Sequence, residues 1–341
     1  MKRESLYFTA PGRVEVRHEE LPGPGPGEAL VRSIVSSLSA GTEMHFFRGD
    51  LPSGTSLDLS IPSLNGTARY PFKYGYSVVG RVEALGEGVP GDWMGRTVLS
   101  LHPHESRFAA PLNELVPVPE DIGAEEATFL PNMETAVNLV QDGGPSIGED
   151  VFVLGQGVVG LLTTALLSRM PLGQLVTVDP HERRRQLSLQ MGAHGSHPSS
   201  LGAKALLGLA GLGGRGADLV YEVSGNPAAL GTAVDLAGFG GRVVVGSWYG
   251  GRRAEVGLGS HFHRDRVRIS SSQVSTVAPG LAGRWDKARR LGLAWEMLRR
   301  VRPGGLVTHR LPFSQAQEAY ELLGSARDEV LQVVLEYGGG D

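Results

Sequence analysis

The segment Val151–Gly160, which reads VFVLGQGVVG, constrains the fold of this chain more than any other stretch. Its first four residues form an unbroken apolar run of the kind found in buried strands, and the overlapping run VVGLLTTALLSRM has the length and composition of a helix. Three glycines therefore stand at a strand-to-helix junction with the spacing G-x-G-x-x-G. This context predicts a parallel βαβ unit with a dinucleotide site at its first turn.

Each glycine of this motif has a separate physical role. Gly155 permits the tight turn, Gly157 lets a pyrophosphate approach the backbone, and Gly160 lets the helix pack close to the strand. The amides at the helix start then face the phosphates, with the positive end of the helix dipole behind them. We expect the whole turn to contact the cofactor, namely Gly155, Gln156, Gly157, Val158, Val159 and Gly160.

An acidic residue strengthens this interpretation. The next apolar run, QLVTVD, ends in Asp179, 19 positions after Gly160 (179 − 160 = 19). A carboxylate about 20 residues after the motif hydrogen-bonds the adenosine ribose and repels a 2′-phosphate, so we expect NAD. Arg184 is close enough in sequence to leave NADP possible. The alternative is that the glycines serve packing alone and that Asp179 caps a helix.

The pattern of runs changes along the 341 residues. Up to about Pro119, short β-rich runs alternate with Gly and Pro clusters, as in a barrel or sandwich. From about Ala124, helix-length segments alternate with short β-branched runs, and two amphipathic helices and a strand close the chain. The length predicts two domains. We expect a nucleotide-binding domain over residues 131–274 and a second domain over residues 1–130 and 275–341.

Charge and cysteine content exclude several classes of function. The chain has 32 Lys and Arg against 36 Asp and Glu, a net charge of −4, so we expect neither nucleic acid nor a membrane as a partner. It has no cysteine, which removes disulfides, thiolate zinc sites and cysteine nucleophiles. The first residues lack the apolar core of a signal peptide, and no run approaches the roughly 20 apolar residues of a membrane span. We expect a cytoplasmic protein.

A β-rich first third is followed by a dinucleotide unit, and several segments carry a family resemblance: GTEMHFFRG, YPFKYGYSVVGRVEALG, ETAV, GQGVVG, VTVD, YEVSG and LVTHRLPF. In these segments and in this order of domains, the chain resembles the medium-chain dehydrogenase/reductase superfamily of the zinc alcohol dehydrogenase type. More narrowly, SAGTE, GYSVVGRV and YEVSG resemble the zinc-free branch that contains bacteriochlorophyllide a dehydrogenase. The resemblance implies an α/β protein with a GroES-like β-rich catalytic domain and a Rossmann domain with a doubly wound parallel sheet. It also implies a homodimer joined at the edge of that sheet, with GRVVVGSWY near the edge.

The residues at the metal positions depart from the zinc enzymes. Where those enzymes have a cysteine, a histidine and a third ligand, this chain has Ala40, Tyr76 and Pro131. The four-cysteine structural lobe is absent as well. Without nitrogen or sulfur ligands, tetrahedral zinc cannot be held in the usual pocket. We therefore expect neither a catalytic nor a structural zinc.

The resemblance assigns a proton path to the first domain. Thr42 and His45 match the hydroxyl and the histidine that pass the substrate proton on in zinc enzymes. Tyr76 stands where the zinc-binding histidine would be, and its phenol could donate a hydrogen bond to a substrate carbonyl. Glu43 matches an acid behind the metal site and could orient Tyr76. The alternatives are a helix cap for Thr42, a surface position for His45, and packing with a tethered hydroxyl for Tyr76.

Further cofactor contacts are implied by the resemblance. Val159 and Thr135 match positions near the nicotinamide, and Ser224 and Gly225 follow the fourth strand at the adenosine side of the crevice. Gln273 lies near the point where the chain leaves the nucleotide domain.

Two histidine pairs admit more than one interpretation. His102 and His104 could bind a metal if both faced one way, but a lone His-x-His pair is expected at the surface. His261 and His263 could edge the substrate cleft or lie in a solvated loop.

Together these features predict a zinc-independent, NAD(P)-dependent oxidoreductase. Its small-molecule substrate would be a secondary alcohol or a carbonyl compound. Two alternatives stay open: a quinone-reductase-like enone reductase, in which hydrogen bonds alone polarise the substrate, and a catalytically silent NAD(H)-binding sensor. Thr42 and His45 weigh against the sensor, because a sensor has little need of a proton relay.

Overall fold

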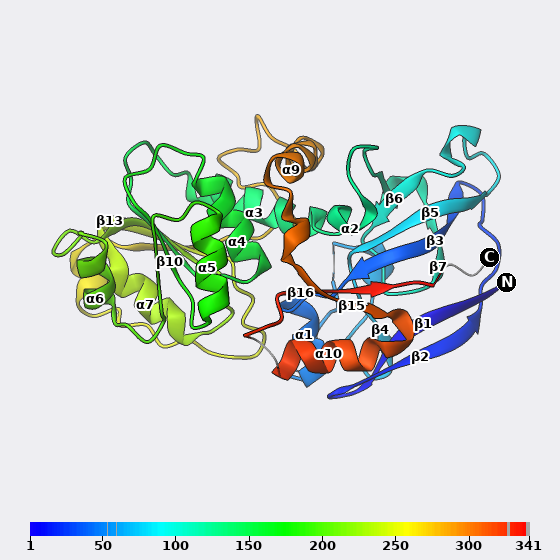
Figure 1. The fold of residues 1–341 in the computed structure, drawn as a ribbon, viewed down its shortest axis with the longest axis horizontal. Coiled ribbons are helices and arrows are strands. Elements are labelled where there is room, and N and C mark those ends of the chain that lie inside the picture. Colours follow the sequence, from blue (N-terminus) through cyan, green and yellow to red (C-terminus); the bar gives the residue numbers. More distant parts are fainter. Residues whose placement is uncertain (53, 59, 326–327, 339–341) are drawn as a thin grey trace. The chain divides into compact units, whose positions relative to one another are not determined.

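The chain folds into two compact units (Figure 1). The first unit consists of residues 1–131 and the chain from Arg302 onward, and the second is Asn132–Val301. The computed structural model describes residues 1–52, 54–58, 60–325 and 328–338.

The second unit is built on a six-stranded parallel sheet in the order β11-β10-β9-β12-β13-β14. The direction of strand addition reverses between β9 and β12, and a crevice opens at the carboxyl ends of the strands at such a switch point. The doubly wound sheet predicted from the sequence is confirmed. Its strands are β9 (Val151–Leu154), β10 (Leu175–Val178), β11 (Gly195–His197), β12 (Ala217–Glu222), β13 (Ala237–Val245) and β14 (Arg268–Ser271).

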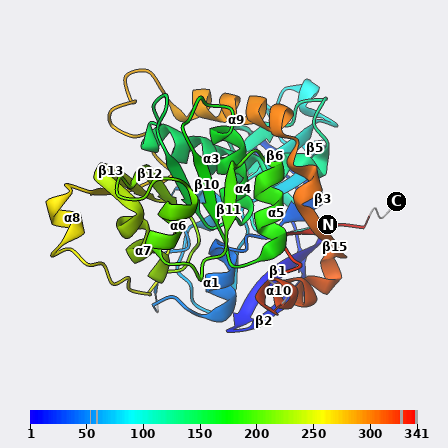
Figure 2. The same ribbon diagram turned by 60° about the vertical axis from the view of Figure 1, so that its left-hand side comes forward.

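Helices cover both faces of this sheet (Figure 2). Val151 and Val153 of β9 pack with α3 and α4, while Phe152 and Leu154 pack with α6 and α7. Burial on both faces explains why the strand sequences are continuously apolar rather than alternating. The helices are α3 (Leu130–Gly143), α4 (Val158–Leu167), α5 (Glu182–Gln190), α6 (Ala203–Leu209), α7 (Ala228–Leu236), α8 (His261–Arg264) and α9 (Lys287–Val301).

Helix α9 lies in the second unit, whereas the sequence placed everything from residue 275 onward in the first domain. The cause is Arg290 of α9, which is fully buried and donates hydrogen bonds to Glu134 of α3. The chain therefore returns to the first unit at Arg302.

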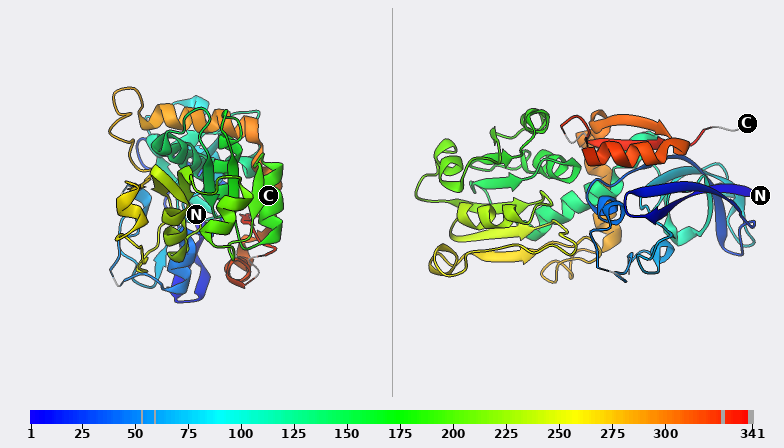
Figure 3. Two further views of the ribbon diagram at one scale, coloured as in Figure 1. Left: turned by 90° about the vertical axis from the view of Figure 1, so that its left-hand side faces the viewer. Right: turned by 90° about the horizontal axis from the view of Figure 1, so that it is seen from below.

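The first unit contains two sheets, and the long β1–β2 ribbon of one of them is the dark blue hairpin in the right view of Figure 3. One has the order β2-β1-β4; the other has the order β15-β16-β3-β5-β6-β8, with β7 also paired to β3. All pairs are antiparallel except β15 with β16. The strands are β1 (Lys2–Ala10), β2 (Arg13–Glu20), β3 (Glu28–Ser37), β4 (Phe72–Lys73), β5 (Val78–Leu85), β6 (Thr97–Ser100), β7 (Arg107–Pro111), β8 (Leu115–Pro117), β15 (Val307–Pro312) and β16 (Gln332–Glu336).

Within the described residues, three α-helices complete this unit: α1 (Thr42–Arg48), α2 (Ala124–Ala127) and α10 (Ala316–Ser325). Strand β16 pairs with β3, and Tyr320 of α10 packs in one aromatic core with Phe8 and Phe47. The end of the chain thereby contributes residues to the interior formed by its beginning. Across the described part of the chain, every helix is too short or too polar to cross a bilayer.

Candidate functional site

The glycine turn connects β9 to α4 at the switch point of the sheet. Gly155 has a φ of +97°, and a Cβ there would lie 2.4 Å from the Cα of Ser224. A Cβ on Gly160 would lie 2.0 Å from the carbonyl oxygen of Gly155. A Cβ on Gly157, by contrast, meets no described atom within 4 Å. The fold itself requires two of the glycines, whereas the middle one faces open space, as a position against a pyrophosphate must.

The start of α4 is suited to an anion. Gly157 is its N-cap residue, and no described side chain caps the helix. The first amides of a helix lack partners within it and carry the positive end of its dipole. Val158 and Val159 occupy the first two helical positions, and Val159 also packs against the apolar cluster around Val153.

Asp179 is joined directly to this turn. Its Oδ2 accepts a hydrogen bond from the amide of Gln156 at 2.7 Å, and its Oδ1 accepts one from the amide of His181 at 2.9 Å. The Gln156 side chain is buried, donates to the carbonyl of Gly155 at 2.9 Å, and accepts from Thr164 at 3.0 Å. Gln156 therefore holds the turn in shape from inside, and only its backbone faces Asp179.

The second half of the sheet brings Ser224 and Gly225 next to the turn. Both follow β12, and the amide of Gly225 donates to the hydroxyl of Ser247 at 2.8 Å. Glu222, which the sequence pattern did not single out, is fully buried at the end of β12 and accepts from the Ser224 amide at 2.8 Å and from the Tyr249 hydroxyl. Burial, together with this hydrogen bond, raises the pKa of Tyr249. The sequence signal that could have identified Glu222 is its position as the acid inside the YEVSG run.

The remaining cofactor candidates lie on separate elements of the second unit. Arg184 is on α5 and Thr135 is on α3, and both are half-buried. Gln273 follows β14, is exposed, and accepts from the amide of Ser275 at 2.5 Å. The structure thus joins Asp179 to the turn, and it places Gln273 at the carboxyl end of the last strand.

One histidine pair lies at the other end of this sheet. The ring of His261 contacts the carbonyl of Ala237 at 2.7 Å, and Ala237 is the first residue of β13. Cofactor crevices form at the carboxyl ends of parallel strands. The position of His261 at an amino end therefore does not fit a cleft edge.

Three of the four catalytic candidates of the first unit, Thr42, Glu43 and Tyr76, contact Ser39, a residue that the sequence pattern did not single out. The Ser39 hydroxyl accepts from the Tyr76 hydroxyl at 2.6 Å and from the amide of Thr42 at 3.1 Å. Thr42 is the first residue of α1, whose N-cap is Gly41, so Thr42 is not the cap. Burial raises the pKa of Tyr76 to about 12, although hydrogen bonds with Ser39 and Thr42 act in the opposite direction. Tyr76 is therefore protonated at neutral pH.

Glu43 is a buried carboxylate with three partners. Its Oε1 accepts from the amide of Ser39 at 3.0 Å, and its Oε2 accepts from His104 Nε2 at 3.1 Å and from the Tyr320 hydroxyl. Burial and the nearby Glu43 carboxylate raise the pKa of Tyr320. Glu43 is expected to orient Tyr76, and Ser39 links the two: its amide donates to Glu43 and its hydroxyl accepts from Tyr76.

His104 is fully buried, contrary to the surface position expected for it. Its Nδ1 lies 2.8 Å from the Ser36 hydroxyl, and its amide donates to the carbonyl of Tyr74 at 3.3 Å. Its ring fills the space beside Gly75, where a Cβ would lie 2.6 Å from it and where φ is +137°. His104 therefore contacts both the turn that precedes Tyr76 and the Glu43 carboxylate.

The other two histidine candidates of the first unit are His45 and the half-buried His102. His45 is buried, and its Nδ1 lies 3.8 Å from the Asp50 carboxylate. His102 stacks on Phe108 with ring centroids 4.1 Å apart, while His104 faces Glu43, so the two rings have different partners. Within the described residues, no group of three or more His, Asp or Glu side chains could hold a metal ion.

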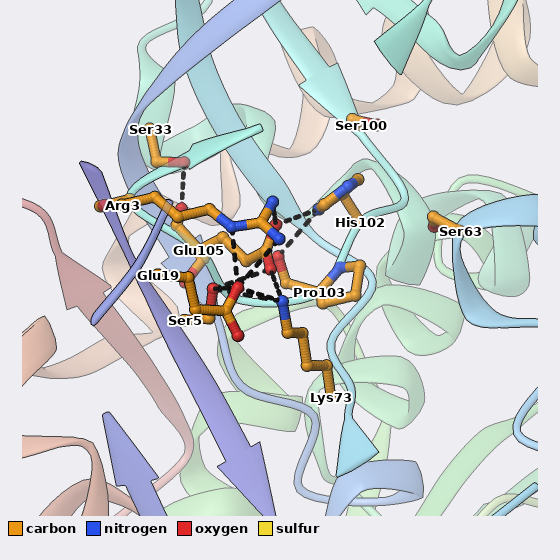
Figure 4. Close-up of polar contacts among 12 residues, drawn as sticks. Arg3, Ser5, Glu19, Ser33, Ser63, Lys73, Ser100, His102, Pro103 and Glu105 are labelled. Atoms are coloured by element: carbon orange, nitrogen blue, oxygen red, sulfur yellow. Dashed lines mark hydrogen bonds and ion pairs between the residues drawn. The ribbon is translucent and has the colours of Figure 1, made fainter. Parts of the chain in front are cut away.

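A pocket of about 360 Å³ lies beside His102 in the same unit, next to a compact charge cluster (Figure 4). Glu105 accepts from Arg3 at 2.9 Å and from Lys73 at 2.7 Å, and Glu19 accepts from the same two cations. Two carboxylates thus balance two cations. We interpret the cluster as a structural link between β1, β2 and β4.

Comparison with known proteins agrees with this architecture. Residues 158–291 match the family model described as zinc-binding dehydrogenase. An alcohol dehydrogenase of Cupriavidus necator is 24% identical, with 98% of each chain covered, and an L-threonine 3-dehydrogenase of Xanthomonas oryzae pv. oryzae is 25% identical, with 90% of this chain and 92% of the relative covered. A structure described as a short chain alcohol dehydrogenase from Escherichia coli with NADH superposes with a TM-score of 0.80 at 19% identity, covering 98% of this chain and 99% of that one.

The chain is therefore an oxidoreductase, as predicted from the sequence: residues 158–291 match a zinc-binding dehydrogenase domain, and the whole chain is similar to alcohol and threonine dehydrogenases and shares their fold.

Proposed function

We propose that this chain is a zinc-independent, NAD-dependent oxidoreductase that transfers hydride between nicotinamide and a secondary alcohol or carbonyl substrate. The observation that carries the proposal is the identity of the residue at the position of the zinc-binding histidine. Tyr76 stands there as a protonated phenol, hydrogen-bonded to Ser39 beside Thr42. A hydrogen-bond donor at that place supplies by itself part of the polarisation that a metal would give.

The glycine turn fits the cofactor. Gly157 leaves room for the pyrophosphate, and the start of α4 supplies amides and a favourable dipole. Asp179 would accept from the adenosine ribose and repel a 2′-phosphate, which favours NAD over NADP. When bound, the nicotinamide accepts or donates the hydride.

The first unit would manage the substrate proton. With a pKa near 12, Tyr76 is a better donor than acceptor at neutral pH, which favours a role in polarising a carbonyl oxygen. In the reducing direction, a hydride adds to the carbonyl carbon and Tyr76 gives its proton to the oxygen. Thr42 and the buried His45 would then relay a proton from solvent to Tyr76, so that each reduction consumes one proton; in oxidation the same steps run backwards and release it.

Cofactor titration tests the proposal most simply. NADH and NADPH are titrated into the purified chain by calorimetry, and we expect NADH to bind more tightly. Asp179→Asn should reduce the difference between the dissociation constants for NADH and NADPH, because it removes the charge that repels a 2′-phosphate. Failure of the wild-type chain to bind either dinucleotide would refute the proposal.

Product analysis separates the alternatives. With NADH deuterated at C4 and a panel of ketones and enones, our proposal predicts deuterium on the former carbonyl carbon. Deuterium on a carbon of the C=C bond would indicate the enone reductase. Tight NADH binding with no turnover over the whole panel would indicate a sensor.

We also propose a cytoplasmic homodimer. Strand β13, within GRVVVGSWY, pairs with the edge strand β14 and so lies near a sheet edge, as expected from the sequence. The four residues of β14 are all exposed in the isolated chain. Gel filtration should give twice the mass of the chain, and a charged substitution at Ile269 should reduce it to that of the monomer.

A further inference from the structure

A buried arginine connects three separate segments of the second unit. Arg290 of α9 is fully buried and is the largest such side chain among the described residues. Its Nε and Nη2 donate to Glu134 Oε1 at 3.0 and 2.9 Å, and its Nη1 donates to Asn138 Oδ1 at 2.5 Å. Both acceptors lie on α3, so the guanidinium joins α9 to α3.

The same guanidinium also holds the loop that follows β14. Its Nη1 donates to the carbonyl of Thr276 at 2.8 Å, and its Nη2 donates to the carbonyl of Val274. Asn138 adds a third contact, because its Nδ2 donates to the Ser272 hydroxyl at 2.9 Å. Residues 272–276, which include Gln273, are therefore fixed to α3 through Arg290 and Asn138. We call these residues the β14 loop.

The position of the β14 loop in the sheet indicates which half of a dinucleotide it would contact. Asp179 follows β10, and an acid at that position contacts the adenosine ribose, so β9, β10 and β11 would carry the adenosine half. The other mononucleotide-binding half of the sheet is β12, β13 and β14, so Ser224 and Gly225, which follow β12, border this half and not the adenosine side expected for them from the sequence. The β14 loop begins at the carboxyl end of its last strand, where the Ser272 amide donates to Val245 of β13 at 2.9 Å. It therefore lies on the nicotinamide side.

Packing alone does not require an arginine at this position. A buried guanidinium is tolerated only when its donors are paired, and replacing a buried ion pair by apolar residues is often neutral or stabilising. Here four of the five bonds from Arg290 go to the Glu134 carboxylate and to two backbone carbonyls of the loop. The planar fork of arginine suits several fixed acceptors at once, in a way that lysine cannot match.

We propose that Arg290 is a positioning residue that holds the β14 loop in the form that receives the nicotinamide half of the cofactor. The inference rests on the proposed function, since it assumes a bound dinucleotide. Arg290 acts through Gln273 and its neighbours, and it touches neither cofactor nor substrate itself. A loosened loop would weaken contacts with the nicotinamide half and leave the adenosine half unaffected.

The test compares two ligands on one protein by calorimetry. NADH contains both halves of the dinucleotide, whereas ADP-ribose lacks the nicotinamide. For Arg290→Met we expect the Kd for NADH to rise by about tenfold or more, which corresponds to the loss of one or two hydrogen bonds to charged groups. The Kd for ADP-ribose should change by less than about twofold. Arg290→Lys should be intermediate, because it keeps the charge and loses the fork.

The neighbouring arginine supplies a matched control. Arg289 lies on the same helix but is exposed, and its guanidinium stacks over Trp285 at 4.1 Å. Arg289→Met should leave both dissociation constants unchanged. If Arg290→Met does not fold, the same titrations are made with Glu134→Gln. This variant weakens the hydrogen bonds that hold Arg290 while keeping the shape of the Glu134 side chain.

The outcomes separate this inference from the proposed function. Wild-type protein that binds neither NADH nor NADPH refutes the proposed function. Wild-type protein that binds NADH, combined with a folded Arg290 or Glu134 variant that loses NADH and ADP-ribose equally or keeps both, refutes the role of Arg290 alone.

Discussion

Tyr76, Ser39, Glu43 and His104 form one hydrogen-bonded group whose members come from three stretches of the first unit. Ser39 accepts from Tyr76, Glu43 accepts from the Ser39 amide, and His104 donates to Glu43. Only a few bonds therefore separate the phenol from a fully buried histidine. At the scale of single residues, the chemistry that we propose depends on the fixed position of this phenol.

Removal of the Tyr76 hydroxyl tests its role directly. Tyr76→Phe should lower kcat/KM by about tenfold or more, because a positioned acid or base contributes roughly 10²–10⁴-fold. The affinity for NADH should not change, because the glycine turn is untouched. Steady-state kinetics together with an NADH titration measure both effects, and an unaltered kcat/KM would assign Tyr76 to packing.

Substitution of His104 tests whether the group acts as a unit. His104→Leu removes a partner of Glu43 and the contact beside Gly75, so kcat/KM should fall by about tenfold. In His104→Gln the side-chain amide can still donate to Glu43, and we expect much of the activity to return. His102→Gln, two residues earlier, is the control and should behave as wild type. Equal activity of the folded Leu and Gln variants would speak against a positioning role.

At the scale of elements, we assign the glycines of the turn between β9 and α4 to two different purposes, packing of the fold and binding of the ligand. Gly160 lies where α4 approaches the turn, and a Cβ there would overlap the Gly155 carbonyl. Gly157 has an ordinary φ of −70° and open space around it. The same motif therefore contains one glycine fixed by packing and one that, under the proposed function, faces the pyrophosphate of a bound dinucleotide.

Two alanine substitutions distinguish these uses. Gly160→Ala should lower the free energy of unfolding by about 1–3 kcal/mol through overpacking. Gly157→Ala should fold normally but raise the Kd for NADH by about tenfold or more, because the methyl group occupies the pyrophosphate position. Thermal unfolding and NADH titration of both variants check this. Normal NADH affinity in Gly157→Ala would count against the site.

Acid stability tests the link between β1, β2 and β4. Burial alone would raise the pKa of Glu19, but hydrogen bonds from Lys73 and Tyr7 outweigh it and lower that pKa to about 2. A carboxyl whose pKa is depressed in the folded state stabilises the fold above its ordinary pKa of 4.5, and this stabilisation is lost as the pH falls from 4.5 towards 2.

Urea unfolding at pH 5, 4 and 3 measures this effect. Glu19→Gln should be less stable than wild type at pH 5, and the difference should shrink at pH 3. The exposed neighbour Glu20 provides the control, since Glu20→Gln should follow the wild-type curve. A constant difference between Glu19→Gln and wild type across this range would contradict the assigned pKa.

At the scale of the whole molecule, local patterns predicted the architecture and missed the long-range contacts. The glycine turn, Asp179 and the parallel sheet follow from periodicity and spacing within one βαβ unit. The burial of His104 could not be predicted, because its partner Glu43 is 61 residues away and Tyr320, which completes the group, is 277 residues from Glu43. The membership of α9 in the second unit was missed for the same reason, since Arg290 pairs with Glu134 across 156 residues.

The central claim is that this oxidoreductase works without a metal. The most direct measurement is the zinc content of purified protein by inductively coupled plasma mass spectrometry, with turnover measured before and after dialysis against a chelator. We predict far less than one zinc per chain and the same turnover in both samples. One zinc per chain, with turnover that the chelator abolishes and added zinc restores, would contradict the account.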